Sequence, residues 1–130
     1  MKTLQGKISW FGGKNDRTMA KNESLSLYPH VTRDWMDEPF YNQNYCAMRF
    51  RWGKMQQKFN LSLSQIKEKV RQAKVIVRFK NKSVVCVPVD WGTARHLNRL
   101  IDVSPLVMKE LGCKTDDVVM VMIPGWIELS

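Results

Sequence analysis

One run of β-branched residues constrains the fold of this chain more than any other feature. Its members are Val84, Val85, Cys86, Val87 and Val89. Such a run is typical of a buried strand. Asp90 follows where the run gives way to Trp91-Gly92-Thr93, which has the composition of a loop. The pattern therefore predicts a strand that presents Asp90 at its end instead of packing it in the core.

A second carboxylate, Asp102, precedes a predicted short helix. Ser104 is a favoured N-cap residue, Pro105 suits the first helical position, and Gly112 can end the helix. A carboxylate just ahead of a helix N-terminus is favoured as an anion. For either aspartate alone, a purely structural role as a turn former or a helix-end charge is as good an interpretation as a functional one.

Four motifs occur in an order that points to one family. Residues 6–12 read GKISWFG and residues 18–23 read TMAKNE, while residues 84–92 read VVCVPVDWG and residues 99–112 read RLIDVSPLVMKELG. They resemble, in turn, the opening Gly-x-Ala-Ser-Trp-Tyr-Gly strand, the Thr-Ala-x-Gly-Glu loop, the Asp-x-Gly turn and the Ile-Asp-Leu-Ser segment of the rare lipoprotein A family. Two positions differ: Ser26 stands where the family usually has aspartate, and Asp90-Trp91-Gly92-Thr93 replaces Asp-Arg-Gly-Pro.

The resemblance implies a mainly β fold, a six-stranded double-psi β-barrel with one or two short helices. It implies a single domain over residues 1–130, with residues 33–73 as an insertion. The family and its relatives, the expansins and membrane-bound lytic transglycosylases, bind or cleave cell-wall glycans. The implied catalytic candidates are Asp90, Asp102 and Glu23, and the implied substrate-binding candidates are Trp10, Thr18, Trp91 and His96. For His96, an ordinary surface histidine is the simpler interpretation.

Length and composition agree with one folded domain. The chain has 130 residues, of which 44% are hydrophobic and 25% charged, which is near the globular average. Residues 1–7 lack the apolar centre of a signal peptide, so we expect cytoplasmic synthesis. A cell-wall function then requires either a processed chain or delivery by a bacteriophage particle, and we favour the virion. Three cysteines and two histidines lack metal-ligand spacing, so we expect no metal and no cofactor.

Periodicity places the remaining elements. It predicts strands at 7–11, 45–51, 74–80, 83–89 and 118–123, with a tight turn at Asn81-Lys82. Apolar residues at helical spacing predict one amphipathic helix over 64–73, capped by Ser62 or Ser64. Pro88 indicates an edge or a crossover in its strand, and residues 33–45 have the composition of a long loop.

Positive charge is concentrated in the middle of the chain, whose net charge is +9. Between residues 49 and 82 the sequence has one acid, Glu68, and eleven basic residues. The basic residues are Arg49, Arg51, Lys54, Lys58, Lys67, Lys69, Arg71, Lys74, Arg78, Lys80 and Lys82. Such a patch attracts anionic partners, and we take Arg49, Arg51, Lys54, Lys58 and Lys67 as partner-binding candidates. The interleaved aromatics Phe50, Trp52, Phe59 and Phe79 could stack on a ligand, although basic outer faces around an aromatic core would give the same alternation.

Two functional hypotheses follow. In the first, the carboxylates cleave peptidoglycan glycan strands by lytic transglycosylation, where one carboxyl group can act first as acid and then as base. In the second, the barrel is a noncatalytic structural or binding module of a phage tail or baseplate, with other virion proteins as partners. Nucleic-acid binding is a third, less favoured alternative.

Overall fold

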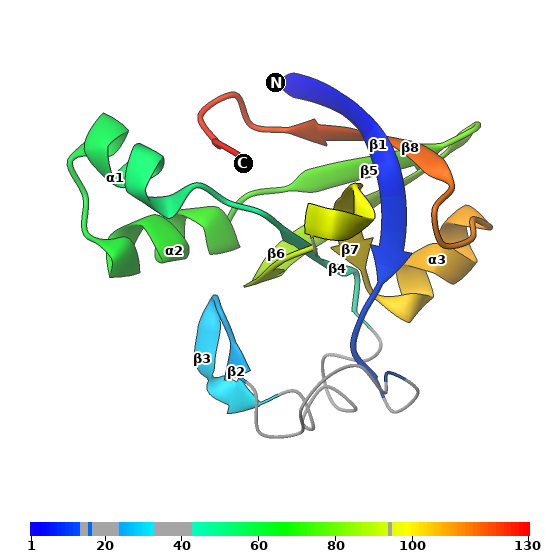
Figure 1. Ribbon diagram of the computed structural model, residues 1–130, viewed down its shortest axis with the longest axis horizontal. Helices are drawn as coiled ribbons and strands as arrows, with labels where there is room; N and C mark the ends of the chain where they lie inside the picture. Colours follow the sequence, from blue (N-terminus) through cyan, green and yellow to red (C-terminus); the bar gives the residue numbers. More distant parts are fainter. Residues whose placement is uncertain (14–15, 17–23, 33–42, 94) are drawn as a thin grey trace.

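Six strands close into a barrel in the order β1-β7-β4-β6-β5-β8 (Figure 1). They are β1 (Lys2–Trp10), β4 (Tyr45–Met48), β5 (Val75–Phe79), β6 (Lys82–Trp91), β7 (Arg99–Val103) and β8 (Val118–Ile123). The computed structural model describes residues 1–13, 16, 24–32, 43–93 and 95–130. A separate two-stranded hairpin is formed by β2 (Ser24–Leu25) and β3 (Tyr28–Thr32).

Strand directions in the barrel are mixed. β1 is parallel to β7 and antiparallel to β8, and β4 is parallel to β6 and antiparallel to β7. The helices are α1 (Trp52–Phe59), α2 (Leu63–Arg71) and α3 (Pro105–Leu111), and a 3-10 turn covers Arg95–Leu97. This closed, mainly β architecture confirms the predicted six-stranded double-psi fold class. The segment 33–73 includes the barrel strand β4 and the helices α1 and α2.

The main core fills the barrel. Its fully buried side chains include Ile8, Met48, Ile101 and Val121, contributed by four different strands. Burying these apolar surfaces is the main free-energy gain that holds the strands together. Gly6 allows β1 to approach β7 closely, because a Cβ atom there would lie 2.6 Å from the Cβ of Leu100.

Several predicted elements match the structure, and some do not. The strand at 118–123 is confirmed as β8, whereas the strand expected at 45–51 ends at Met48 because α1 begins at Trp52. β7 was not predicted, and it takes up the residues around Asp102. The tight turn comprises Lys80 and Asn81, one residue earlier than expected, since Phe79 pairs with Lys82 and Lys80 takes the left-handed conformation.

The helix expected at 64–73 is confirmed as α2, with Ser62 as its N-cap. The Ser62 hydroxyl accepts a hydrogen bond from the Gln65 amide, and the Gln65 side chain accepts one from the Ser62 amide. This capping box satisfies two amides that a helix start leaves unpaired. The preceding helix α1 lacks a side-chain cap and an acidic first turn, which explains why the sequence pattern did not reveal it.

Removing the α2 cap should destabilise the fold modestly. We expect Ser62→Ala to lower the free energy of unfolding by about 1 kcal/mol, because the Gln65 amide loses its acceptor. Urea unfolding followed by circular dichroism measures this change. Ser64→Ala is the matched control: Ser64 is an exposed residue inside α2, so its replacement should leave stability unchanged or slightly raised. Equal losses in both variants would contradict the assignment of the cap.

Candidate functional site

Asp90 and Asp102 lie in one row across four neighbouring strands. Both stand opposite Ala47 of β4, Asp90 from β6 and Asp102 from β7, and Asp102 also pairs with Ser9 of β1. We call Ser9, Ala47, Asp90 and Asp102 the carboxylate row. Since neighbouring strands are about 4.8 Å apart, the Cα atoms of the two aspartates are separated by about 10 Å. The structure therefore brings both predicted carboxylates together.

Asp90 is packed and not presented, which corrects the expectation from sequence. Asp90 is only 4% exposed, and its Oδ1 atom accepts hydrogen bonds from the amides of Ser26 (2.8 Å) and Trp91 (2.9 Å). The reason is a bulge: Cys46 pairs with Pro88 but Ala47 pairs with Asp90, so one extra residue shifts the register of β6. Asp90 thereby fastens the turn of the β2-β3 hairpin to the barrel.

Further contacts hold the hairpin in place. The Leu27 amide donates to the Val89 carbonyl at 3.2 Å, and the Arg71 guanidinium donates to the Leu27 carbonyl at 3.3 Å. A second apolar cluster lies on this side of the barrel and consists of Phe11, Leu25, Tyr45, Ala47 and Val89. The carboxylate row thus adjoins an apolar layer that joins the hairpin to β4 and β6.

Asp102 has a different environment from Asp90. It is partly exposed in the middle of β7, and its negative charge helps to raise the pKa of Arg99. The larger cause of that rise is the side-chain hydrogen bond from Arg99 to Asp116, which also lowers the pKa of Asp116. Asp102 is therefore a partly exposed residue beside a positive charge, and its Oδ1 atom is itself buried.

The other predicted substrate-binding residues are dispersed around this row. Trp91 directly follows Asp90, is 39% exposed and donates its indole N–H to the Phe50 carbonyl. Trp10 is partly buried at the end of β1, and His96 is exposed in the 3-10 turn. Glu23 and Thr18 lie outside the described residues. Trp91 thus adjoins Asp90 along β6, and Trp10 adjoins Ser9 of the carboxylate row along β1.

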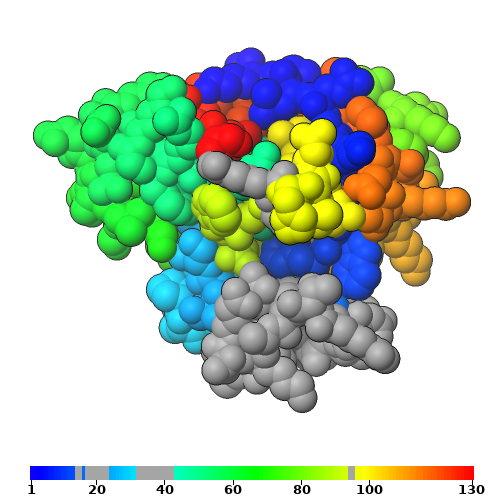
Figure 2. Space-filling view, in the orientation of Figure 1, coloured from blue at the N-terminus to red at the C-terminus, as the bar shows by residue number. Residues whose placement is uncertain are grey.

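The predicted basic residues gather mainly on α1 and α2, which lie together at one side of the molecule (Figure 2). Glu128 accepts ion pairs from Lys54 (3.3 Å) and Lys58 (3.6 Å), and these lysines hold the pKa of Glu128 below its ordinary value, chiefly through the hydrogen bond with Lys54. Lys67 lies 5.8 Å from the ring centre of Trp52. We call the outward side chains of Arg51, Lys54, Lys58 and Lys67 the basic helical face.

Arg49 does not belong to this face. Its guanidinium donates to the Thr93 hydroxyl and to the Arg99 carbonyl, each at 2.7 Å. Phe50 is likewise a core residue, 2% exposed and packed on Trp52. These two residues show that part of the alternating basic and aromatic pattern is structural.

The described cysteines are free and buried, and they show no metal-site geometry. Burial raises the pKa of Cys86 to about 12, so its thiol is protonated at neutral pH. Within residues 1–13, 16, 24–32, 43–93 and 95–130, no group of three His, Cys, Asp or Glu side chains is arranged to hold a metal ion.

The strand order of the barrel, and not a sequence match, identifies the fold of this chain. No family model and no curated protein matches this chain. Among solved structures, it is similar to the computationally designed msDPBB_sym2 protein, with 11% identity, a TM-score of 0.48, and coverage of 95% of this chain and 100% of that one. It is also similar to the rationally designed mkDPBB_sym2 protein, with 17% identity, a TM-score of 0.46 and the same coverage of 95% and 100%.

Proposed function

We propose that this protein cleaves peptidoglycan glycan strands by lytic transglycosylation at the carboxylate row. The proposal rests on the resemblance of its motifs to the rare lipoprotein A family. The observation that carries it is the alignment of Asp90 and Asp102 opposite the same residue, Ala47. Cooperating carboxyl groups at a glycosidic bond lie within about 10 Å of each other, and a Cα separation of about 10 Å allows the two side chains to reach that range.

The environments of the two aspartates support different roles for them in this proposal. Asp102 is the more exposed residue of the two, so it is the acid that protonates the leaving glycosidic oxygen and the base that then takes the proton from the sugar's C6 hydroxyl. Attack of that hydroxyl on the anomeric carbon breaks the glycosidic bond and closes an anhydro ring. Asp90 is a positioning residue, because its Oδ1 atom already accepts two backbone hydrogen bonds. Trp91 offers an apolar surface for a sugar ring.

The remaining family positions complete this proposal. Glu23 and Thr18 line the same groove in the resemblance, with Trp10 and His96 at its margins. Delivery to the wall would occur in a virion. The described part of the chain contains no helix that is long and apolar enough to cross a bilayer.

The product spectrum tests the proposed activity directly. Purified peptidoglycan incubated with the protein should release anhydromuropeptides, which mass spectrometry identifies by the loss of one water relative to hydrolytic products. Reducing sugars without the anhydro ring would indicate hydrolysis and contradict transglycosylation. No release at all would remove the enzymatic proposal and leave the second candidate.

The second candidate is a noncatalytic binding module, and the basic helical face favours it. Arg51, Lys54 and Lys58 are exposed on or next to α1, and Lys67 is partly exposed on α2. We expect the triple change Arg51→Glu, Lys58→Glu and Lys67→Glu to weaken co-sedimentation with purified sacculi by about tenfold or more, since charge reversal repels an anionic surface. Rising salt should weaken the wild-type association steeply.

A matched control separates a local surface from net charge. Lys109→Glu and Lys114→Glu, combined with Lys7→Glu, reverse three exposed lysines away from α1 and α2. This variant should retain most of the association. If it loses as much binding as the first variant, the basic helical face is not the binding surface.

A further inference from the structure

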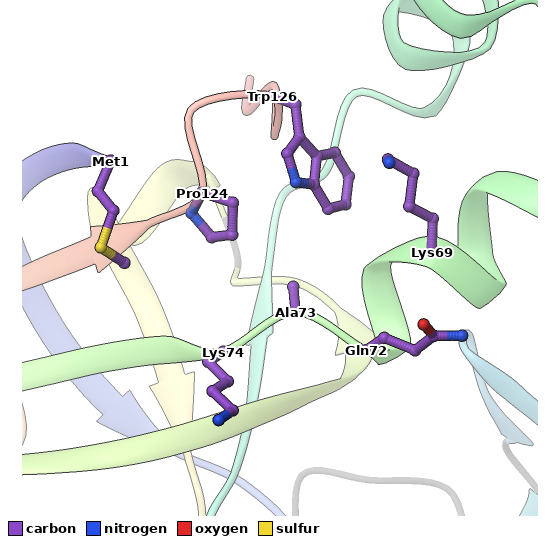
Figure 3. Close-up of a pocket in the computed structure, with 7 residues that line it drawn as sticks. All are labelled: Met1, Lys69, Gln72, Ala73, Lys74, Pro124 and Trp126. Atoms are coloured by element: carbon purple, nitrogen blue, oxygen red, sulfur yellow. The ribbon is translucent and has the colours of Figure 1, made fainter.

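A cavity of about 400 Å³ opens between the end of α2 and the segment that follows β8 (Figure 3). It is lined by Met1, Lys69, Gln72, Ala73, Lys74, Pro124 and Trp126. Two of these residues are lysines and none is acidic. The cavity shares no residue with the carboxylate row or with the basic helical face.

Aromatic rings hold one of the two lysines. The ammonium group of Lys69 lies 4.6 Å from the ring centre of Trp126 and 4.8 Å from that of Phe59, and the two rings meet edge to face at 5.9 Å. Attraction to the π faces positions the charge without a carboxylate. Its N–H groups are therefore available to an anion from outside.

The positive charge at this cavity has no acidic partner among the described residues. Across the described part of the chain, neither Lys69 nor Lys74 forms an ion pair. Glu128, by contrast, forms ion pairs with Lys2, Lys54 and Lys58 nearer α1. A ligand anion would thus supply the missing counter-charge at the end of α2.

The other walls match the remaining surfaces of a sugar. Pro124, Ala73 and Met1 provide apolar contacts, and Figure 3 shows the indole of Trp126 between Pro124 and Lys69. Gln72 and Lys74 are exposed at the rim, and Figure 3 shows both side chains directed away from Trp126. Lys69 covers one face of Trp126, so a bound ring contacts the remaining surface of the indole while its carboxylate reaches the ammonium directly.

We propose that this cavity binds a carboxylate-bearing sugar of an acidic glycan, with Lys69 pairing with the carboxylate and Trp126 and Pro124 contacting the ring. Lys74, whose side chain is directed away from Lys69, adds long-range attraction at the rim of the cavity. The site goes beyond the proposed function, since it lies on other elements and requires no turnover. The two proposals therefore fail separately. Loss of sugar binding at this cavity would overturn this proposal, and absence of anhydromuropeptide release would overturn the transglycosylase proposal.

Nuclear magnetic resonance of the Trp126 indole N–H tests the proposal. The signal is assigned by its loss in Trp126→Phe, and the probe is a short oligosaccharide of alternating glucuronate and N-acetylglucosamine. We expect a saturable shift of this signal. The double variant Lys69→Gln and Lys74→Gln should bind at least about tenfold more weakly, because the charge-assisted contact with Lys69 and the long-range attraction of Lys74 are both lost.

Controls decide between this ligand and other anions. The double variant Lys109→Gln and Lys114→Gln lowers the net charge equally at exposed positions elsewhere and should bind as the wild type does. The proposal is overturned if the acidic oligosaccharide causes no saturable shift, or if a neutral chitin oligosaccharide, oligothymidylate or inorganic phosphate binds as tightly. It is also overturned if both double variants weaken binding to the same extent.

Discussion

Replacing Asp102 with asparagine is expected to lower the release of anhydromuropeptides by about 10²-fold or more, because an amide can neither give nor take up the proton that transglycosylation transfers. The side chain keeps its size, so the fold should be retained. Mass spectrometry of products from purified peptidoglycan provides the measurement, and sedimentation with sacculi should show that binding survives.

The matched control for this prediction is Asp116→Asn. Asp116 is an exposed aspartate that shares the neighbourhood of Arg99 with Asp102. Its replacement should leave the rate of release within about twofold of the wild type, since it removes a surface ion pair of small energetic value. If Asp102→Asn retains full activity, or if both variants lose it equally, Asp102 is not the acid.

Replacing Asp90 with alanine should have the largest effect on stability. We expect the free energy of unfolding to fall by about 2–4 kcal/mol, because the amides of Ser26 and Trp91 lose a charged acceptor. Urea unfolding measures the loss, and hydrogen exchange should show faster exchange at the Ser26 amide as the β2-β3 hairpin separates from β6. An alanine variant as stable as the wild type would contradict the fastening role of Asp90.

Asp90→Asn then distinguishes positioning from proton transfer. The asparagine keeps an oxygen that can accept from Ser26 and Trp91, so most of the stability should remain. If Asp90 acts by positioning alone, product release should persist in this variant. A loss of release by about 10²-fold with the fold intact would instead assign Asp90 to proton transfer, as the sequence motifs alone allow.

The strands were predictable where local pattern and burial agree. The β-branched runs that form β6 and β8 are apolar enough to be identified without knowledge of their partners. β7 was missed because Arg99–Val103 is short and its two charged residues, Arg99 and Asp102, resemble the approach to a helix. α1 was missed because it has no side-chain cap, although Trp52, Met55 and Phe59 follow helical spacing.

The candidate site was predictable only in its residue types. Asp90 and Asp102 face the same residue because β4 pairs with both of their strands, and Asp90 is buried because of one bulge. Neither the strand pairing nor the bulge leaves a signal in a single sequence. Trp126 was overlooked since it follows the last strand, in a Pro-Gly-Trp segment without periodicity. Its importance comes from Lys69 and Phe59, which are remote from it in the chain.

The pairing of β1 also determines when this barrel can form during synthesis. β1 ends at Trp10, but both of its neighbours, β7 and β8, lie between Arg99 and Ile123. A ribosome therefore exposes β1 with unpaired edges until nearly all of the described chain has emerged. Such long-range contacts carry a large entropic cost of loop closure. Folding is therefore slow, on the order of milliseconds to seconds. Nascent chains of this protein should thus depend on protection from aggregation until β8 is available.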